Sequence, residues 1–287
     1  MAISYPATLP IQPFTKPVRG SVTLPGSKSI TNRALILAAL GTKTVTLRGA
    51  LFSRDTRIMV AALQALGFTV ATDEKALTIT ITGRGGEIPN REARIDVGNA
   101  GTAARFLTAF VCLRPDGTYH FDGDEAMRRR PIGALLESLE AQGARASARN
   151  FPFTLKTAGL PGGTVGLDAS ESSQMLSALL MVAPHARTPL TVKLKGAAGS
   201  KPFVVMTEAM LQQFAAQPTD YAIEGDASAA SYFLALPIVT GGALKFTNYG
   251  GPLQGDVKFR DVIAQVGPAR RAVTQNFREF SDTFLTL

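Results

Sequence analysis

The hydrophobic positions of this chain fall into short runs with helical spacing, and each run follows a strand-like segment and a turn of small polar residues. Four such openings occur, at residues 24–29, 97–102, 169–174 and 224–228. In the first unit the apolar spacing predicts, in order, a helix over 33–40, a strand over 44–47, a helix over 57–66 and two strands over 69–71 and 77–81. Together with the strand before the turn, this order is βαβαββ.

The same order recurs further along the chain. The corresponding helices and strands are predicted over 103–113, 118–121 and 132–142, then over 174–182, 190–194 and 204–214, then over 227–236, 243–247 and 259–266. Aligned on Ser27, Asn99, Ser172 and Ala227, the units repeat after 72, 73 and 55 residues. The third unit therefore lacks about 17 residues. The sequence predicts an α+β fold of repeated βαβαββ units packed around buried helices.

The shortening divides the chain unevenly. After Phe214, residues 215–220 are too few for two further strands. We therefore expect one complete domain of three units over residues 22–221, and a partial second domain made of residues 1–21 and 222–287. In the tail, apolar side chains at helical spacing predict an amphipathic helix that covers otherwise exposed core; they are Val273, Phe277, Phe280, Phe284 and Leu287.

The four turns are candidate anion sites, because a helix that starts at a small polar turn presents backbone N–H groups and the positive end of its dipole. At the first turn, Lys28, Ser29 and Arg33 bring an ammonium, a hydroxyl and a guanidinium within one helical turn. The remaining candidates are Asn99, Gly101, Thr102, Arg105, Arg130, Ser172, Ser173, Gln174 and Asp226. The alternative for each turn is an ordinary helix cap. Four equivalent turns in a repeat favour a shared binding role.

Composition narrows the class of ligand. The 287 residues are 45% hydrophobic, have a formal charge of +8 and include no tryptophan. Scattered basic residues with few aromatic ones favour small anionic partners over nucleic acid. Cys112 lies in an apolar run and the two histidines, His120 and His185, are isolated, so neither a metal site nor a disulfide is expected. No apolar run spans a bilayer and residues 1–14 contain no signal-like core, which predicts a cytoplasmic protein without membrane contact.

The turn residues, in their order and spacing, resemble the 5-enolpyruvylshikimate-3-phosphate (EPSP) synthase family of enolpyruvyl transferases. The segments that carry the resemblance are Leu24–Ser29 with Asn32–Ala34, Gly98–Ala103 with Arg105, Arg130–Gly133, Ser172–Gln174, Ser200–Pro202 and Glu224–Ser228. The resemblance extends to about Gly267. It leaves out the shortened stretch after Phe214 and the tail from Pro268.

The resemblance implies transfer of the enolpyruvyl group of phosphoenolpyruvate to the 5-hydroxyl of shikimate-3-phosphate, with release of phosphate, in the route to chorismate and aromatic amino acids. No cofactor is implied, and glyphosate is implied as an inhibitor at the phosphoenolpyruvate site. Lys28 is implied as the catalytic residue in contact with both substrates. The other implied site residues are Ser29, Arg33, Ser172, Ser173 and Ser200 for shikimate-3-phosphate, Gly101, Arg130 and Gln174 for phosphoenolpyruvate, and Asn99, Thr102, Arg105 and Asp226 beside them.

The chain also departs from the family pattern. The acidic base, the Lys-Glu-x-x-Arg segment and the Asp-His-Arg segment of the family are not found, which predicts that shikimate-3-phosphate is bound better than it is turned over. A truncated relative that binds this ligand with little turnover is the alternative function. Phe203 replaces the usual tyrosine and loses a hydroxyl contact. Phe106 stands where proline is frequent, and we expect it to alter glyphosate tolerance.

Two further readings follow from the same residues. The sister transferase that acts on UDP-N-acetylglucosamine uses a loop cysteine, and the apolar surroundings of Cys112 disfavour it. The incomplete second domain predicts self-association, since an isologous partner would cover the face that the missing residues leave open.

Overall fold

The structure is a computed structural model that describes residues 6, 8–170, 172–196, 201–267 and 283. The predicted tail helix and Ser200 lie outside the described residues. The helices are α1 (Lys28–Leu40), α2 (Arg54–Ala65), α3 (Gly101–Val111), α4 (Glu125–Arg128), α5 (Gly133–Glu140), α6 (Ser173–Val182), α7 (Lys201–Ala215), α8 (Ala227–Thr240) and α9 (Phe259–Val266), with the 3-10 turns η1 (Ala183–His185) and η2 (Gly255–Lys258).

The strands are short and distributed along the whole described chain. They are β1 (Arg19–Val22), β2 (Thr44–Arg48), β3 (Val70–Asp73), β4 (Thr78–Thr82), β5 (Glu92–Asp96), β6 (Thr118–Asp122), β7 (Arg145–Ala146), β8 (Phe153–Lys156), β9 (Gly163–Leu167), β10 (Leu190–Leu194), β11 (Asp220–Ala222) and β12 (Ala243–Phe246). The predicted helices and strands over 33–266 are confirmed, with ends that differ by a few residues because terminal turns are decided by local caps.

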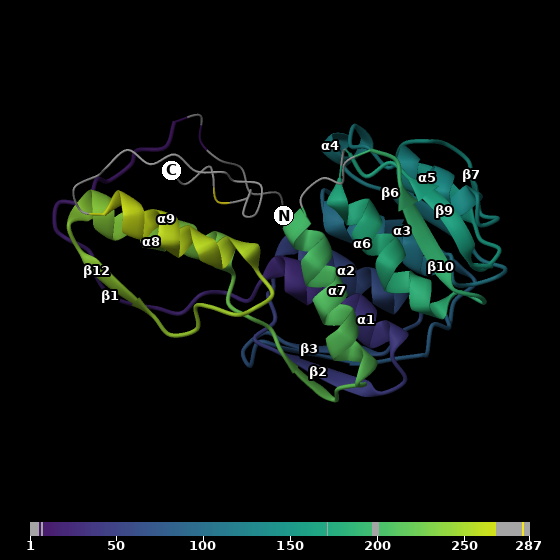
Figure 1. Ribbon diagram of the computed structural model, residues 1–287, viewed down its shortest axis with the longest axis horizontal. Helices are drawn as coiled ribbons and strands as arrows, with labels where there is room; N and C mark the ends of the chain where they lie inside the picture. The colour runs from purple at the N-terminus through teal and green to yellow at the C-terminus, as the bar shows by residue number, and fades with distance from the viewer. Residues whose placement is uncertain (1–5, 7, 171, 197–200, 268–282, 284–287) are drawn as a thin grey trace.

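Figure 1 shows two lobes: β1, β12, α8 and α9 form the smaller one, and the other labelled helices and strands form the larger one. Three helices of the larger lobe, α1, α3 and α6, form its centre and contact one another. Every residue of α3 is buried, as is every residue of α1 from Ile30 onward. A helix that is apolar on all sides finds its lowest free energy when surrounded by protein. The outer helices α2 and α7 pack on this centre and expose one side. The prediction of βαβαββ units around buried helices is therefore confirmed.

Two four-stranded sheets have the same internal order. One runs β11-β2-β4-β3 and the other β5-β6-β8-β7. In each sheet the first two strands are parallel and the following pairs are antiparallel. The third unit contributes only the parallel pair β9 and β10. Residues 216–219, between α7 and β11, contain no strand, as the short third interval predicted.

One strand does not pair within the repeat unit that its position along the chain suggests. The strand before α1, β1, opens the first βαβαββ unit in the sequence pattern, although residues 1–21 are expected in the partial second domain, and it pairs in parallel with β12. The position beside β2 is filled by β11, which comes after the third unit. The reason is that the chain crosses between the two lobes just before α1 and again just before α8. Figure 1 shows β1 and β12 together under α8 and α9 in the smaller lobe.

The two crossing segments run side by side. Ser27 N donates to Glu224 O at 2.8 Å, and Asp226 N donates to Pro25 O at 2.9 Å. Gly26 lies between them, where a Cβ atom would overlap the carbonyl oxygen of Gly49. These contacts set the helix starts of α1 and α8 next to each other. No helix in the described part of the chain has the length and apolarity needed to cross a membrane.

Candidate functional site

The starts of α3 and α6 and the side chain of Arg130 meet at one place. Gln174 Nε2 donates to Thr102 Oγ1 at 3.4 Å, which joins the first turns of α6 and α3. Arg130 Nη1 donates to Asn99 O at 3.3 Å. A Cβ atom on Gly101 would stand only 2.5 Å from Arg130 Nη2. Glycine at this position is thus what allows the guanidinium to lie directly against the start of α3.

The start of α1 faces the start of α8 in the other lobe. Lys28 Nζ lies 3.3 Å from Asp55 Oδ2, and both side chains are partly exposed. Lys28 N donates a long hydrogen bond of 3.4 Å to Asp226 Oδ2. Ser29 and Asp226 line a cavity of about 20 Å³ between the lobes. This volume admits about one water molecule, so a phosphorylated ligand requires the lobes to stand further apart at this point.

The capping alternative can be tested at each helix start. Ser27 before α1 and Ala100 before α3 make no side-chain cap bond. Ser172 does cap α6 by accepting from Gln174 N at 3.2 Å, and Asp226 caps α8 by accepting from Ala229 N at 2.9 Å. None of α1, α3 and α6 has an acidic residue in its first turn. The dipoles of α1 and α3 thus meet no negative side chain from their own helix starts.

Arg33 does not face the cavity. Its side chain is buried, and its guanidinium donates to Thr207 Oγ1, Ser29 O, Ser177 Oγ and Phe203 O at 2.7 to 3.2 Å. Four of its five N–H groups are therefore used within the protein.

Two aromatic rings lie over the same guanidinium. The ring centroids of Phe106 and Phe203 are 5.1 and 5.8 Å from Arg33 Cζ. Burial lowers the pKa of Arg33 to about 9, which leaves it protonated at neutral pH. The hydrogen bonds and rings favour that charged form. In this arrangement Arg33 joins α1 to α3, α6 and α7.

Arg105 is a second buried guanidinium below the site. It donates to Gly101 O at 3.3 Å and to Pro131 O, which ties the start of α3 to the segment that carries Arg130. Burial and the charge of Arg130 lower its pKa to about 10. Its role in the structure is to hold Arg130 and Gly101 in register, since its own N–H groups point into the protein.

Of the other predicted residues, Asn99 is exposed and Ser173 is buried in the first turn of α6. Asp55 was missed by sequence reasoning, although it lies in the first turn of α2 where acidic residues are favoured. Gln174 Oε1 is buried without a hydrogen-bond partner in the described residues, whereas most buried acceptors are paired with a protein group or an ordered water.

Cys112 and the acidic side chains are further candidates for parts of a site. Cys112 is fully buried, and burial raises the pKa of its thiol well above the usual range, so it is not an available nucleophile. Within the described ranges, no group of three or more histidine, cysteine, aspartate or glutamate side chains is arranged to hold a metal ion.

Comparison with known proteins identifies a family. The family model for EPSP synthase (3-phosphoshikimate 1-carboxyvinyltransferase) matches residues 13–220 and 215–282. A 3-phosphoshikimate 1-carboxyvinyltransferase of Opitutus terrae is 48% identical over 98% of this chain, and one of Aliivibrio fischeri is 40% identical over 91%. The match reaches residue 282, so the expectation that the tail departs from the family pattern at Pro268 was wrong.

Solved structures agree at the level of the fold. An EPSP synthase from Acinetobacter baumannii superposes with a TM-score of 0.73, at 22% identity, over 89% of this chain. The chain spans 72% of the Opitutus relative, 66% of the Aliivibrio relative and 61% of the Acinetobacter structure. About a third of the relatives' length has therefore no counterpart here.

Proposed function

The chain belongs to the EPSP synthase family, and from this premise we propose that it transfers the enolpyruvyl group of phosphoenolpyruvate to the 5-hydroxyl of shikimate-3-phosphate with release of phosphate. The observation that carries the proposal is the convergence of the α3 and α6 starts, Arg130 and the glycine that admits it. Each substrate carries a phosphate, and two such anions lie side by side only where positive charge and N–H donors surround them.

We propose distinct tasks for the residues at the two faces of the site. Arg130 and the uncapped start of α3 receive the carboxylate and phosphate of phosphoenolpyruvate, with Gly101 leaving room for them. Gln174, whose Oε1 has no partner among the described residues, accepts a hydrogen bond from a donor group of a bound ligand. Ser172 and Ser173 are ligands of the second phosphate, and Ser29 at the start of α1 is a further ligand of it.

Lys28 is proposed as the group that contacts both substrates. Its ammonium is partly exposed and its nearest carboxylate is that of Asp55, so it can exchange this partner for an incoming phosphate. Arg33 is not proposed as a ligand, because its N–H groups are already used within the protein. Its task in this proposal is to join the inner helices behind the site.

The remaining expectations stay predictions. Glyphosate is proposed to compete with phosphoenolpyruvate at Arg130 and Gly101, the cytoplasm remains the expected compartment, and self-association through the smaller lobe is proposed because α8 exposes apolar side chains. The sister transferase is disfavoured by the burial of Cys112 at the end of α3.

The deciding experiment measures phosphate release by the purified chain with shikimate-3-phosphate and phosphoenolpyruvate together, beside calorimetric titration of shikimate-3-phosphate alone. We expect turnover, and we expect Lys28→Ala to lower kcat/KM by on the order of a hundredfold or more, as removal of a group that stabilises transition-state charge does. Lys43→Ala is the matched control, because Lys43 is an exposed lysine just beyond the opposite end of α1.

The alternative outcomes are distinct. Binding of shikimate-3-phosphate without phosphate release would identify a binding relative that does not catalyse the transfer. The proposal would be refuted if the chain neither bound shikimate-3-phosphate nor released phosphate. An equal loss in the Lys28 and Lys43 variants would remove the assignment of Lys28.

A further inference from the structure

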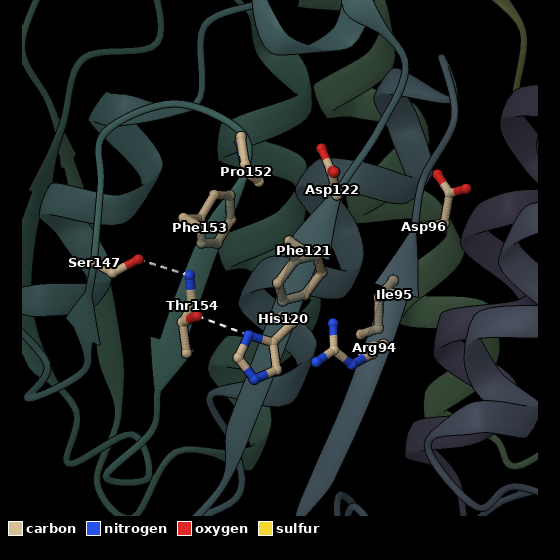
Figure 2. Close-up of a pocket in the computed structure, with 10 residues that line it drawn as sticks. All are labelled: Arg94, Ile95, Asp96, His120, Phe121, Asp122, Ser147, Pro152, Phe153 and Thr154. Carbon is tan, nitrogen blue, oxygen red and sulfur yellow. Dashed lines mark hydrogen bonds between the residues drawn. The ribbon is translucent and has the colours of Figure 1, made fainter.

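A cavity of about 330 Å³ opens on the outer face of the β5-β6-β8-β7 sheet. Figure 2 shows its lining side chains, which rise from the strands and from the loop between β7 and β8. None of them lines the cavity between the lobes. The outer face of this sheet is therefore a second concave surface, separate from the candidate site.

The floor of this cavity is a row of polar side chains in cross-strand register. Arg94 on β5 is paired with His120 on β6, which is paired with Thr154 on β8. Thr154 Oγ1 lies 2.8 Å from His120 Nδ1, and Ser147 Oγ accepts from Thr154 N at 2.8 Å. Figure 2 shows the Arg94 guanidinium beside the His120 ring. When Thr154 donates to Nδ1, the neutral ring carries its proton on Nε2 and can donate it to a ligand beside Arg94.

Opposite charges line this cavity without being paired to each other. Arg94 is exposed and makes no hydrogen bond or ion pair with any described residue, whereas Arg91 and Arg128 of the same unit each bind a carboxylate within 2.9 Å. Asp96 lies two residues after Arg94 on β5. It accepts one hydrogen bond, from the backbone Gly98 N, and has no cationic partner in the described chain.

These charges lie in neighbouring rows of the sheet, because residues two apart on a strand share a face and are separated by about 7 Å. A second acidic side chain, Asp122, stands across from Asp96, but Arg128 holds it through two hydrogen bonds of 3.0 and 2.8 Å. The free charges of the cavity are thus one cation in the first row and one anion in the next.

We propose that this cavity binds a small zwitterion of amino-acid size. Its carboxylate binds the Arg94 guanidinium and the His120 ring, and its ammonium binds the Asp96 carboxylate. The exposed ring of Pro152 supplies an apolar wall for a side chain. A purely anionic ligand fits less well, because Asp96 would repel it at short range.

The two histidines of the chain make the test direct, since His120 lies in the cavity and His185 lies in η1, away from it. We would record imidazole NMR resonances while adding one of three ligands. L-leucine carries both charges, N-acetyl-L-leucine carries the negative charge alone, and L-leucinamide carries the positive charge alone. We expect saturable shifts of His120 with L-leucine, at least tenfold weaker binding of the two blocked forms, and no change at His185.

Variants of the protein test the contribution of each charged side chain to binding in the same way. Arg94→Gln and Asp96→Asn are each expected to weaken L-leucine binding on the order of tenfold or more, and Asn at 96 keeps an acceptor for Gly98 N. Arg84→Gln, at an exposed arginine outside the cavity, is expected to bind as the unchanged chain does. Equal binding of L-leucine and its N-acetyl form, or no saturable shift of His120, would overturn the proposal.

Discussion

At the scale of single residues, Arg33 belongs to a motif typical of substrate binding, but its side chain stabilises the interior of the protein. The sequence places it one turn from Lys28 and Ser29, which suggested a cluster around one anion. The structure directs its guanidinium away from the cavity, toward Ser177 and Thr207. Phe106 and Phe203, noted as two unrelated departures from the family pattern, turn out to lie against this one side chain.

This arrangement predicts a large stability cost for a small change at Arg33. Arg33→Lys keeps the charge but loses the planar fork, so at least two buried acceptors lose their donor and the stacking on both rings is weakened. We expect the free energy of unfolding to fall by about 2 to 4 kcal/mol, measured by urea denaturation. The control is Arg48→Lys, whose guanidinium is exposed beside Asp220 and is worth less than about 1 kcal/mol. A similar small change in both variants would contradict the structural role of Arg33.

At the scale of elements, the start of α3 depends on one glycine and one arginine from another segment. Gly101 opens the helix without a side-chain cap, and Arg130 reaches it from the loop before α5. Arg105 holds both segments through two backbone carbonyls. The geometry of this element is therefore set by side chains about 25 residues apart along the chain, rather than by its own first turn.

We predict that Gly101→Ala displaces Arg130 and weakens phosphoenolpyruvate binding. The added methyl group would lie 2.5 Å from Arg130 Nη2, so the guanidinium has to move. We expect KM for phosphoenolpyruvate to rise on the order of tenfold in the phosphate-release assay, with little change in the unfolding midpoint. In Gly133→Ala, at the start of α5, the nearest atom to the new Cβ is 3.6 Å away. An unchanged KM in the Gly101 variant would contradict the predicted displacement.

The helices and most strands could be predicted because their signals are local. Apolar runs such as 33–40 and 174–182 have helical spacing, and Gly or polar residues mark their ends. The pairing of β1 with β12 could not be predicted, because a strand's partner depends on contacts more than two hundred residues away. For the site, the residue types could be predicted from the sequence, but the directions in which their side chains point could not. Lys28 and Arg33 carry the same charge and lie close together on α1, yet Arg33 points inward because Phe106 and Phe203 enclose its guanidinium.

At the scale of the whole molecule, the two lobes differ in how well they bury their helices. In the larger lobe, α1 and α3 are enclosed on all sides. The smaller lobe contains an equally apolar helix, α8, of which only Ala227, Ala230 and Ser231 are buried. Tyr232 and Val239 are exposed by 63% and 64%. An apolar helix left open in this way is a surface for association.

We therefore predict that the chain self-associates through α8. The mass measured by light scattering during gel filtration should rise above the monomer value of 30.3 kDa as the concentration increases, because association follows mass action. Val239→Lys should keep the chain monomeric. Val205→Lys, on α7 and 55% exposed, is the matched control and should associate as the unchanged chain does. Monomers at all concentrations, or an equal effect of both variants, would argue against this interface.

The position of β11 beside β2 has a consequence for how the chain is made. The paired residues Thr46 and Asp220 are 174 positions apart, and ribosomes add residues at about 5 to 20 per second, so β2 waits roughly 9 to 35 s for its parallel neighbour. During that time β2 has β4 on one side and an open edge on the other, which is the kind of edge that pairs with other chains. The nascent protein thus passes through a period of exposure that the finished fold conceals, and slower synthesis makes that period longer.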